Sequence, residues 1–490
     1  MKRKKGSITL ARASLRCNKA KGRVDESESH DGLFPYFDNL PSHITTQILL
    51  QLSIKSLLIC KCVCKIWKTM ISEPHFAKLQ FERAPLSLMI RTNDGRLVSR
   101  TMYLLECDHE KFEIGSNNHV KLAPIFKLPL RNANSYREKI ENKPKRPIRA
   151  ARLALEKNGE NSNGDSQRLN IDFKPYYDKF GVANSCNGLL CLCCPSDEHP
   201  LSICNPVTGE FIKLPEATIN THDERSPLNM RGQVGFGFQP KTNEYKVIRI
   251  WGSDVKRGNR WVFDRMVLEI YTLGTPSWRN AEVDPQISIG SNIWLRYPTC
   301  VNGTIHWIRF KGQERSILCF CLENERLQSF PSPPVLQNQN NGFRHNECIR
   351  IGELRGLLYI CDTSFFRDVA MWVMNEYGIG ESWTKVYNID TLVSPLGRPD
   401  SQRYEGAAIL LYHSCNCLIY YEPEKLGFKV FRIQGTSSEF VEIIPHVPSL
   451  ISLKDVVKGD NIEVLNIHSR CANVELPEEN EVLSLSQQTV

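Results

Sequence analysis

Apolar residues recur at steps of three and four between residues 38 and 81, and this pattern stops near residue 85. Ile44, Ile48 and Leu52 fall on one face of a helix at this spacing. Beyond residue 85 the chain consists of short aliphatic and aromatic runs that Gly, Asn and Pro separate. This change of period predicts an α+β multidomain protein, in which a small helical unit precedes a large all-β domain.

The helical unit is predicted to contain three short helices. Leu40-Pro41 supplies the entry to the first, because a proline at a helix start gives up only an N–H that has no partner there. Ser53 breaks the pattern and can cap a second helix that carries Leu57 and Leu58. A third helix ends at Pro74, and its apolar face is made of Val63, Ile66, Trp67, Met70 and Ile71. Three helices in about 35 residues bury little surface, so such a unit usually needs a partner.

The order of residue types in this unit resembles the F-box, the module that joins a substrate receptor to a ubiquitin ligase. The residues that carry the resemblance are Leu40-Pro41, Ile48-Leu49, Ser56-Leu57 and the run Val63-Cys64-Lys65-Ile66-Trp67. His43 stands where the family commonly has an acidic residue, and Ser53 stands where it often has proline. Neither lies on the apolar face, so we expect binding to the adaptor to be weakened and not abolished.

The resemblance implies that the chain is a non-catalytic receptor subunit. Its partners would be a Skp-family adaptor, through that adaptor the cullin and RING subunits, and an unknown target protein. No catalytic residue, cofactor or metal is implied. The residues that we expect to contact the adaptor are Leu40, Pro41, Ile44, Ile48, Leu52, Leu57, Leu58, Val63 and Trp67.

Thirteen strand-like runs follow the helical unit. They are 86–91, 102–107, 188–194, 201–204, 245–251, 268–272, 304–310, 316–322, 357–361, 370–374, 408–412, 417–421 and 429–433. Turns at Gly188, Gly303, Gly356 and Asn416 open a weak repeat of strand, turn and strand, and its period of about 50 residues is typical of kelch-like blades. The sequence therefore predicts a β-propeller-like domain from about 85 to 450.

Motifs in the β domain carry a second resemblance, to the plant F-box-associated domain. They are Asn187-Gly188-Leu-Leu, Asn205-Pro206-Val207-Thr208-Gly209, the run from Gly235 to Val247 (GFGFQPKTNEYKV), and Val301-Asn302-Gly303 with His306-Trp307. Together with the helical unit, the two resemblances cover roughly residues 38–435. They imply a small three-helix F-box followed by an all-β, β-propeller-like domain.

These patterns divide the chain into four parts. We predict a basic disordered tail at 1–33, the F-box at 34–82, the propeller-like domain at 85–450 and a C-terminal tail at 451–490. A polar and basic stretch at 131–170 is predicted to be a disordered loop inserted in the β domain. No apolar stretch is long enough for a membrane span, and the N-terminus has no apolar signal segment. We therefore expect the protein in the nucleus, the cytoplasm or both.

The net charge of +8 is concentrated at the N-terminus. Nine basic residues and no acidic residue lie in the first 24 positions, so the rest of the chain is close to neutral. That balance argues against nucleic-acid binding as the main role of the fold. The run Lys2-Arg3-Lys4-Lys5 fits a nuclear import signal, a transit peptide or a solvated tail. A nuclear nucleic-acid-binding protein that uses this tail remains one alternative function.

Eighteen cysteines do not form a pattern of metal ligands or disulfides. Cys191 and Cys194 have C-x-x-C spacing, but no second pair follows at the distance of a zinc site. On a strand, residues three apart also point to opposite faces. With no sign of export, we expect buried, reduced thiols and no metal.

Catalytic motifs are absent from the sequence, including the G-x-S-x-G, H-E-x-x-H and phosphate-loop patterns. His306 is expected to be structural, and the glycines at Gly235 and Gly237 are expected to serve close packing. Trp251 and Trp261 can be target contacts, but core positions are the more common place for such aromatic residues. A kelch-like propeller enzyme is the second alternative, because propellers assemble sites from separate loops.

Overall fold

The computed structural model describes the helical unit and most strands of the β domain. The described residues are 40–85, 87–93, 101–106, 119–127, 181–193, 200–215, 233–257, 260–284, 287, 293–311, 314–337, 349–354, 356–365, 368–390, 409–413, 417–422, 427–434, 440–457, 462–466 and 484–487. The predicted disordered parts at 1–33 and 131–170 lie outside these residues. The chain separates into two compact units, residues 1–49 and residues 50–490.

The first unit contributes one described helix, α1 (Ser42–Leu49). The carbonyl of Pro41 accepts bonds from the backbone N–H groups of Ile44 and Thr45, at 2.9 and 3.1 Å. Pro41 therefore starts the helix from the position just before its first residue, where its missing N–H costs nothing.

Three more helices follow, so the helical segment has four helices where three were predicted. They are α2 (Ile54–Cys60), α3 (Lys65–Ser72) and α4 (Pro74–Arg83). Ser53 caps α2 as predicted, because its Oγ accepts the N–H of Ser56. Pro74 follows the end of α3 but is itself the first residue of α4, a position that proline favours. Phe76 and Ala77 bury one face of this added helix.

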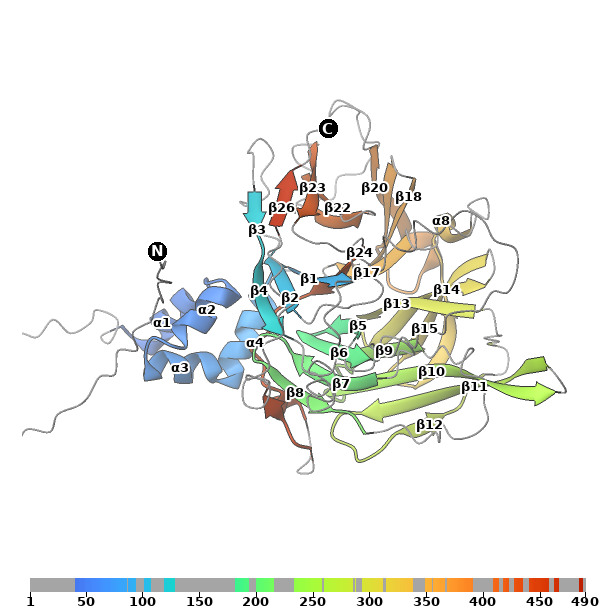
Figure 1. The fold of residues 1–490 in the computed structure, drawn as a ribbon, viewed down its shortest axis with the longest axis horizontal. Helices are drawn as coiled ribbons and strands as arrows, with labels where there is room; N and C mark the ends of the chain where they lie inside the picture. The colour runs from blue at the N-terminus through green and yellow to red at the C-terminus, as the bar shows by residue number, and fades with distance from the viewer. Residues whose placement is uncertain are drawn as a thin grey trace, which may run out of the picture. The chain divides into compact units, whose positions relative to one another are not determined.

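The β domain consists of six antiparallel sheets among the described residues, and we number them as blades around a ring (Figure 1). Blade 1 is β24 (Phe440–His446), β1 (Ser87–Asn93), β2 (Thr101–Glu106) and β4 (Ala123–Lys127). Blade 2 is β5 (Gly181–Cys186), β6 (Leu189–Cys193), β7 (Pro200–Asn205), β8 (Glu210–Lys213) and β25 (Leu465–Asn466). Blade 3 is β9 (Gln233–Gln239), β10 (Glu244–Arg257), β11 (Arg260–Thr272) and β12 (Arg279–Ala281).

The other three blades follow the same order along the chain. Blade 4 is β13 (Ile293–Val301), β14 (Thr304–Lys311), β15 (Glu314–Cys321) and β16 (Arg326–Phe330). Blade 5 is β17 (Ile349–Leu354), β18 (Leu357–Phe365), β19 (Asp368–Met374) and β20 (Trp383–Asp390). Blade 6 is β21 (Ile409–His413), β22 (Cys417–Glu422), β23 (Gly427–Gln434), β26 (Ser484–Gln487) and β3 (His119–Lys121).

Apolar clusters join each blade to the next and close the ring. Blades 1 and 2 share a cluster that includes Met89 and Leu190. Similar clusters join blades 2 and 3, 3 and 4, 4 and 5, and 5 and 6. Blade 6 then packs on blade 1 through Leu418, Phe431 and Leu88. This circular arrangement confirms the predicted fold class, a helical segment followed by an all-β propeller.

The C-terminal part of the chain closes the ring. β24 pairs with β1, so blade 1 combines strands from both ends of the domain. Arg91 on β1, which is almost fully buried, makes an ion pair with Glu442 on β24. β25 and β26 lie beyond residue 450 and pair with β8 and β23. The predicted tail at 451–490 therefore supplies two strands to the propeller, and the domain does not stop at 450.

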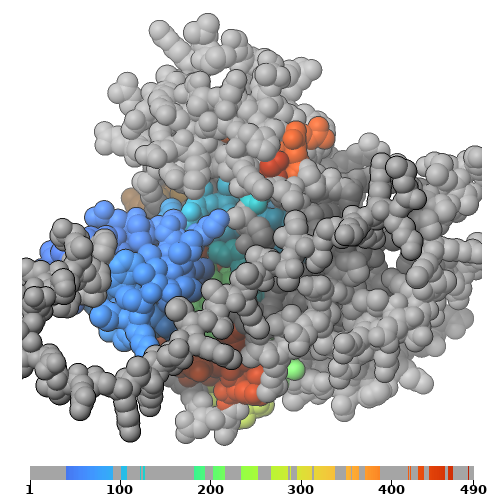
Figure 2. Space-filling view, turned by 60° about the vertical axis from the view of Figure 1, so that its left-hand side comes forward, coloured from blue at the N-terminus to red at the C-terminus, as the bar shows by residue number. Residues whose placement is uncertain are grey.

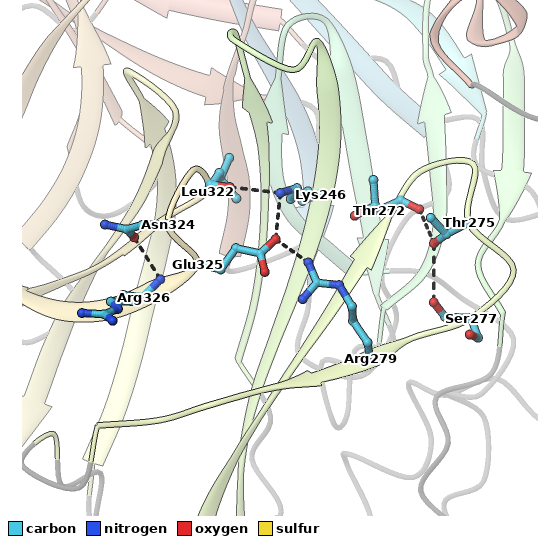
Figure 3. Close-up of polar contacts among 9 residues, drawn as sticks. All are labelled: Lys246, Thr272, Thr275, Ser277, Arg279, Leu322, Asn324, Glu325 and Arg326. Atoms are coloured by element: carbon cyan, nitrogen blue, oxygen red, sulfur yellow. Dashed lines mark hydrogen bonds and ion pairs between the residues drawn. The ribbon is translucent and has the colours of Figure 1, made fainter.

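A polar network ties blade 3 to blade 4 (Figure 3). The buried Nζ of Lys246 on β10 donates to the carbonyl of Leu322 at 3.0 Å and to Oε1 of Glu325 at 2.8 Å. Arg279 on β12 binds the same carboxylate oxygen. Partial burial acts to raise the pKa of Glu325, but the bonds from Arg279 and Lys246 outweigh it and hold that pKa below its usual value. Lys246 is the second lysine of the Gly235–Val247 motif, so this part of the motif holds two blades together.

Candidate functional site

Exposed apolar side chains gather in the helical segment. Seven large apolar residues are exposed among the described residues, and five of them lie between residues 44 and 66. Ile59, Val63 and Ile66 are each about 60% exposed, at 61%, 63% and 60%. They follow one another at steps of four and three, from the end of α2 to the start of α3. Contiguous exposed apolar patches are typical of surfaces that bind another protein.

Helix α1 carries a second exposed apolar pair. Ile44 and Ile48 are 39% and 43% exposed and lie one turn apart, whereas Leu49 is buried. In Figure 2 the helices carry the blue colours of the N-terminal part of the chain. α1 thus offers two isoleucine side chains to solvent on one face.

The predicted adaptor contacts differ in exposure. Pro41, Ile44, Ile48 and Val63 are exposed, and Leu40, Leu52, Leu58 and Trp67 are half-buried. Leu57 is fully buried, so it supports the core of the segment and cannot be a contact in this conformation. Val63 was expected in the third helix but lies in the turn before α3.

Sequence reasoning did not include Ile59 and Ile66 among the contacts, although both are more exposed than Ile44. Their spacing from Val63 gave no reliable signal, because Ile59 lies on α2, Val63 in the turn and Ile66 on α3, and residues three and four apart share a face only within one helix. The N-cap of α3 was not predicted either. It is Cys64, whose Sγ accepts the N–H of Trp67 at 3.4 Å. The F-box-like run Val63–Trp67 therefore sets the start of α3 as well as its surface.

The Asn205–Gly209 motif of blade 2 binds the C-terminal segment, residues 447–453. We call this contact the clasp. Asn205 is fully buried, and its Nδ2 donates to the carbonyls of Ser449 and Ile451 at 3.0 and 2.7 Å. Its Oδ1 accepts the N–H groups of Val207 and Thr208, which forms the turn. All the bonding capacity of this amide is used within the fold.

Gly188 belongs to the same clasp. It has a φ of +77°, and a Cβ at this position would lie 2.2 Å from Cβ of Ser449 and 3.0 Å from the carbonyl of Val447. Glu210 completes the clasp, because its carboxylate accepts the N–H of Leu453 at 2.8 Å. Both motifs that opened the second resemblance thus hold the returning segment 447–453, and neither forms an open site.

The Gly235–Gly237 motif serves close packing, as predicted. A Cβ on Gly235 would lie 2.4 Å from Cζ2 of Trp307, and one on Gly237 would lie 2.9 Å from Sγ of Cys300. Only hydrogen at these two positions of β9 allows blade 4 to approach so closely. Trp307 is fully buried at this contact.

His306 is buried and bonded on both ring nitrogens. Nδ1 lies 3.4 Å from the carbonyl of Thr299, and Nε2 lies 2.9 Å from the hydroxyl of Tyr377. Because a carbonyl only accepts, Nδ1 carries the proton and Nε2 accepts from Tyr377. Burial lowers the pKa of His306 to about 4, despite bonds to the backbone of Thr299 and Thr304 that act to raise it. A general base works best with a pKa near the operating pH, so this histidine has a structural role.

Burial of His306 makes stability depend on pH. Because the folded pKa is about 4 and the unfolded pKa is about 6.5, the unfolded chain binds more protons in this window. Its contribution is present above about pH 6.5 and is lost as the pH falls towards 4. We expect about 2 kcal/mol of unfolding free energy to be lost from His306 between about pH 7.5 and about pH 5. Urea unfolding of the wild type and His306→Gln at both pH values tests this, and parallel losses in the two proteins would contradict it.

A Ser–His pair in the ring does not form a nucleophile. Oγ of Ser185 lies 2.9 Å from Nδ1 of His446, which is almost fully buried. Burial lowers the pKa of His446 to about 3, too low for efficient proton removal near neutral pH. The pair joins β5 of blade 2 to β24 of blade 1 and fits a structural bond across the ring closure.

Six of the described cysteines of the β domain are buried, but Cys62 and Cys64 of the helical segment are exposed, contrary to the expectation of buried thiols. Cys191 and Cys204 are reduced and fully buried, and burial raises the pKa of each thiol well above its usual value. Within the described ranges, no group of three or more His, Cys, Asp or Glu residues is placed to hold a metal.

Trp251 is 4% exposed and donates from Nε1 to Glu269 at 3.1 Å, so it is a core residue. The side chain of Trp261 lies outside the described residues. None of the described helices combines the length and the apolar character needed to cross a membrane.

Comparisons with known proteins identify both parts of the chain. The family model for the F-box domain matches residues 37–79, and the model for the F-box associated beta propeller domain matches residues 151–453. An F-box protein of Arabidopsis thaliana is 27% identical over 337 residues, which is 61% of this chain and 76% of that protein. An F-box/kelch-repeat protein of the same plant is 24% identical over 386 residues, or 78% of this chain and 87% of that one.

The solved structures that match this chain resemble it only weakly. A GH32 beta-fructofuranosidase of Bombyx mori matches 52% of this chain and 60% of its own, at 11% identity and a TM-score of 0.27. A likeness at this level bears on neither the activity nor the site of this chain. The exposed apolar residues of the helical segment remain the feature that most clearly marks a binding surface.

Proposed function

Because the chain belongs to the family that carries the F-box associated beta propeller domain behind an F-box, we propose that it is the substrate-recognition subunit of a Skp–cullin–F-box ubiquitin ligase. It has no catalytic role of its own in this proposal. The F-box binds a Skp-family adaptor, which connects it to cullin and RING subunits, and the propeller binds a target protein. The protein works in the nucleus, the cytoplasm or both.

The observation that carries the proposal is the exposure of Ile59, Val63 and Ile66. Three side chains of this size cost free energy when they face water, and burial against a partner recovers about 1.5–3 kcal/mol for each. They lie on α2, on the turn that follows it and on α3, which suits a contact of helices with a groove in an adaptor. Ile44 and Ile48 on α1 add further apolar surface of the same kind.

The mechanism needs no side-chain chemistry in this chain. A target held on the propeller stays close to the ubiquitin-charged enzyme that the other subunits bring. The transfer then becomes effectively intramolecular, and the rate rises through effective concentration. The buried histidines are consistent with this passive role, because their lowered pKa values suit them poorly to proton transfer.

A binding assay with purified Skp adaptor tests the proposal. We expect the full chain to bind and Val63→Asp plus Ile66→Asp to weaken binding by about 2 kcal/mol or more, roughly thirtyfold, because charges would enter an apolar contact. These residues are preferable to Leu57, which is buried and whose change would destabilise the segment. Isothermal titration or surface plasmon resonance measures the dissociation constant.

Ile379 provides the matched control. It is 46% exposed and lies in the turn between β19 and β20, outside the helical segment. Ile379→Asp should leave adaptor affinity unchanged. The proposal fails if the folded wild-type chain does not bind the adaptor, or if all three proteins bind with equal affinity.

A further inference from the structure

Outside the helical segment, the large exposed apolar side chains of the described residues are confined to one turn of the propeller. They are Tyr377 and Ile379, which are 38% and 46% exposed. Both lie between β19 and β20 of blade 5, in a turn at residues 375–382 that includes the 3₁₀ helix η3 (Gly380–Ser382). Single exposed apolar residues are ordinary on protein surfaces, so the concentration of this pair in one turn is the observation that needs an explanation.

Hydrogen bonds within the turn hold its backbone in one shape. The hydroxyl of Ser382 donates to the carbonyls of Glu376 and Ile379, at 2.8 and 2.7 Å. The N–H of Ile379 donates to the carbonyl of Glu376 at 3.1 Å. At the base of the turn, Nδ2 of Asn375 donates to Oγ1 of Thr384 at 2.9 Å. A segment that is ordered before it binds loses less conformational entropy on binding, so these bonds favour its use as a contact surface.

Contacts with blade 4 fix the ring of Tyr377. Its hydroxyl donates to Nε2 of His306 at 2.9 Å. The centroid of its ring lies 5.3 Å from that of Phe330 and 5.7 Å from that of His306. The hydroxyl is therefore satisfied inside the fold, while part of the side chain stays exposed. A tyrosine held in this way offers a rigid contact area at low entropic cost, and tyrosine is enriched among the residues that dominate binding energies.

Two carboxylates flank the exposed pair. Glu376 and Glu381 lie on either side of it in the sequence, and both are exposed. Neither carboxylate makes an ion pair with any residue that the structure describes. Lys385 on β20, which is exposed, is the nearest cation along the chain, and it joins neither of them. The turn thus offers apolar surface between two negative charges, which complements a cationic partner.

We propose that the turn at 375–382 binds the target protein, through a segment of the target that carries an apolar side chain beside lysine or arginine. This role rests on the proposed function, in which the propeller holds the target. The apolar side chain packs on Tyr377 and Ile379, and the cationic groups lie near the carboxylates of Glu376 and Glu381. An apolar centre with a charged rim is common in protein interfaces. The two carboxylates also disfavour acidic segments, which gives the surface its specificity.

Selection of random linear peptides displayed on phage, against the full chain, tests this specificity. We expect selected peptides in which lysine or arginine lies next to an aliphatic or aromatic residue. Fluorescence anisotropy then measures their dissociation constants. Glu376→Lys plus Glu381→Lys should raise these constants about tenfold or more, because like charges then face each other across the contact. Ile379→Asp should weaken binding by a similar factor, because it places a charge in the apolar centre.

A charge-matched control separates a local contact from general attraction. Glu282→Lys plus Glu314→Lys makes the same change of net charge at exposed positions on blades 3 and 4, and it should leave peptide affinity unchanged. The side chains of Glu376, Ile379 and Glu381 make no hydrogen bond or ion pair within the described residues, so the variants of the turn should keep the melting temperature of the wild type. An equal loss of affinity in the control would overturn the proposal.

Adaptor affinity, measured on the same proteins, separates this surface from the ligase role. Loss of peptide binding in the variants of the turn, with adaptor affinity unchanged, supports both. Peptide binding of the expected kind by a chain that does not bind the adaptor retains the surface and refutes the ligase role. Adaptor binding by a chain that selects no peptide, only acidic peptides, or peptides that bind the variants equally well refutes the surface alone.

Discussion

Gly235→Ala should destabilise the propeller by about 3 kcal/mol, at the upper end for overpacking in a core. The added Cβ would lie 2.4 Å from Cζ2 of Trp307 and 2.9 Å from Cγ2 of Ile305. Neither neighbour is a flexible end that can move away, because both side chains are fully buried between blades 3 and 4. Urea unfolding followed by tryptophan fluorescence measures the effect as a shift of the midpoint.

Gly380→Ala is the matched control for that substitution. Its Cβ would meet only Cβ of Pro331, at 3.4 Å, which is an ordinary contact. We expect a change within about 0.5 kcal/mol. A double-mutant cycle with Trp307→Phe sharpens the test, because a smaller ring should relieve part of the cost of Gly235→Ala. Equal costs in the two backgrounds would show that the packing against Trp307 is not the cause.

Asn205→Ala should cost about 4 kcal/mol, the largest effect that we expect from a single side chain. The substitution removes four hydrogen bonds inside the fold. It leaves the carbonyls of Ser449 and Ile451 without these donors, and each buried polar group left unsatisfied costs about 1–3 kcal/mol. Hydrogen exchange should show faster exchange in residues 447–453 than in blades 4 and 5, because the clasp holds only the C-terminal segment.

Two further variants distinguish the bonds that Asn205 makes to the C-terminal segment from the bonds that it makes within its own turn. Asn205→Asp keeps an oxygen for the N–H groups of Val207 and Thr208 but cannot donate to the two carbonyls, so we expect it to be nearly as damaging. Asn324→Ala removes a comparable turn bond, from Oδ1 to the N–H of Arg326, at an exposed site. It should cost less than about 1 kcal/mol. Protection of 447–453 that is unchanged in Asn205→Ala would refute the clasp.

The middle strands of the blades could be predicted from the sequence, and the strands at both edges of the blades largely could not. Each of the thirteen predicted runs lies on a strand of the propeller. Among the strands that were not predicted are β5, β13, β17 and β24 at one edge of their blades and β4, β12, β16 and β20 at the opposite edge. β5 shows why: Asn184 and Ser185 give it no alternation of apolar residues. Nδ2 of Asn184 donates to the carbonyl of Phe236, and Ser185 bonds to His446. Polar bonds to other blades stabilise this strand, and those neighbours are distant in sequence.

The candidate binding surface was predicted in part. The sequence correctly placed three of the four helices and the Ser53 cap, and Ile44, Ile48 and Val63 are exposed, although Val63 lies in the turn before α3 and α4 was not predicted. It could not separate Leu57 from Ile59, because both are aliphatic residues in the same short helix. Burial depends on which side of α2 meets the rest of the protein, and composition carries no information about that side. Whether the predicted residues bind the adaptor stays a prediction.

The sequence alone determined the division into helical segment and propeller, because a helical period of three to four and short strands between turns are local properties of the chain. It also determined the two family motifs. Only the tertiary structure decided what those motifs do. Gly235, Asn205 and Lys246 belong to these motifs, and each contacts a partner between about 70 and 250 positions away. Closure of the propeller ring brings such positions together. A local sequence pattern does not indicate contacts between residues so far apart in the chain.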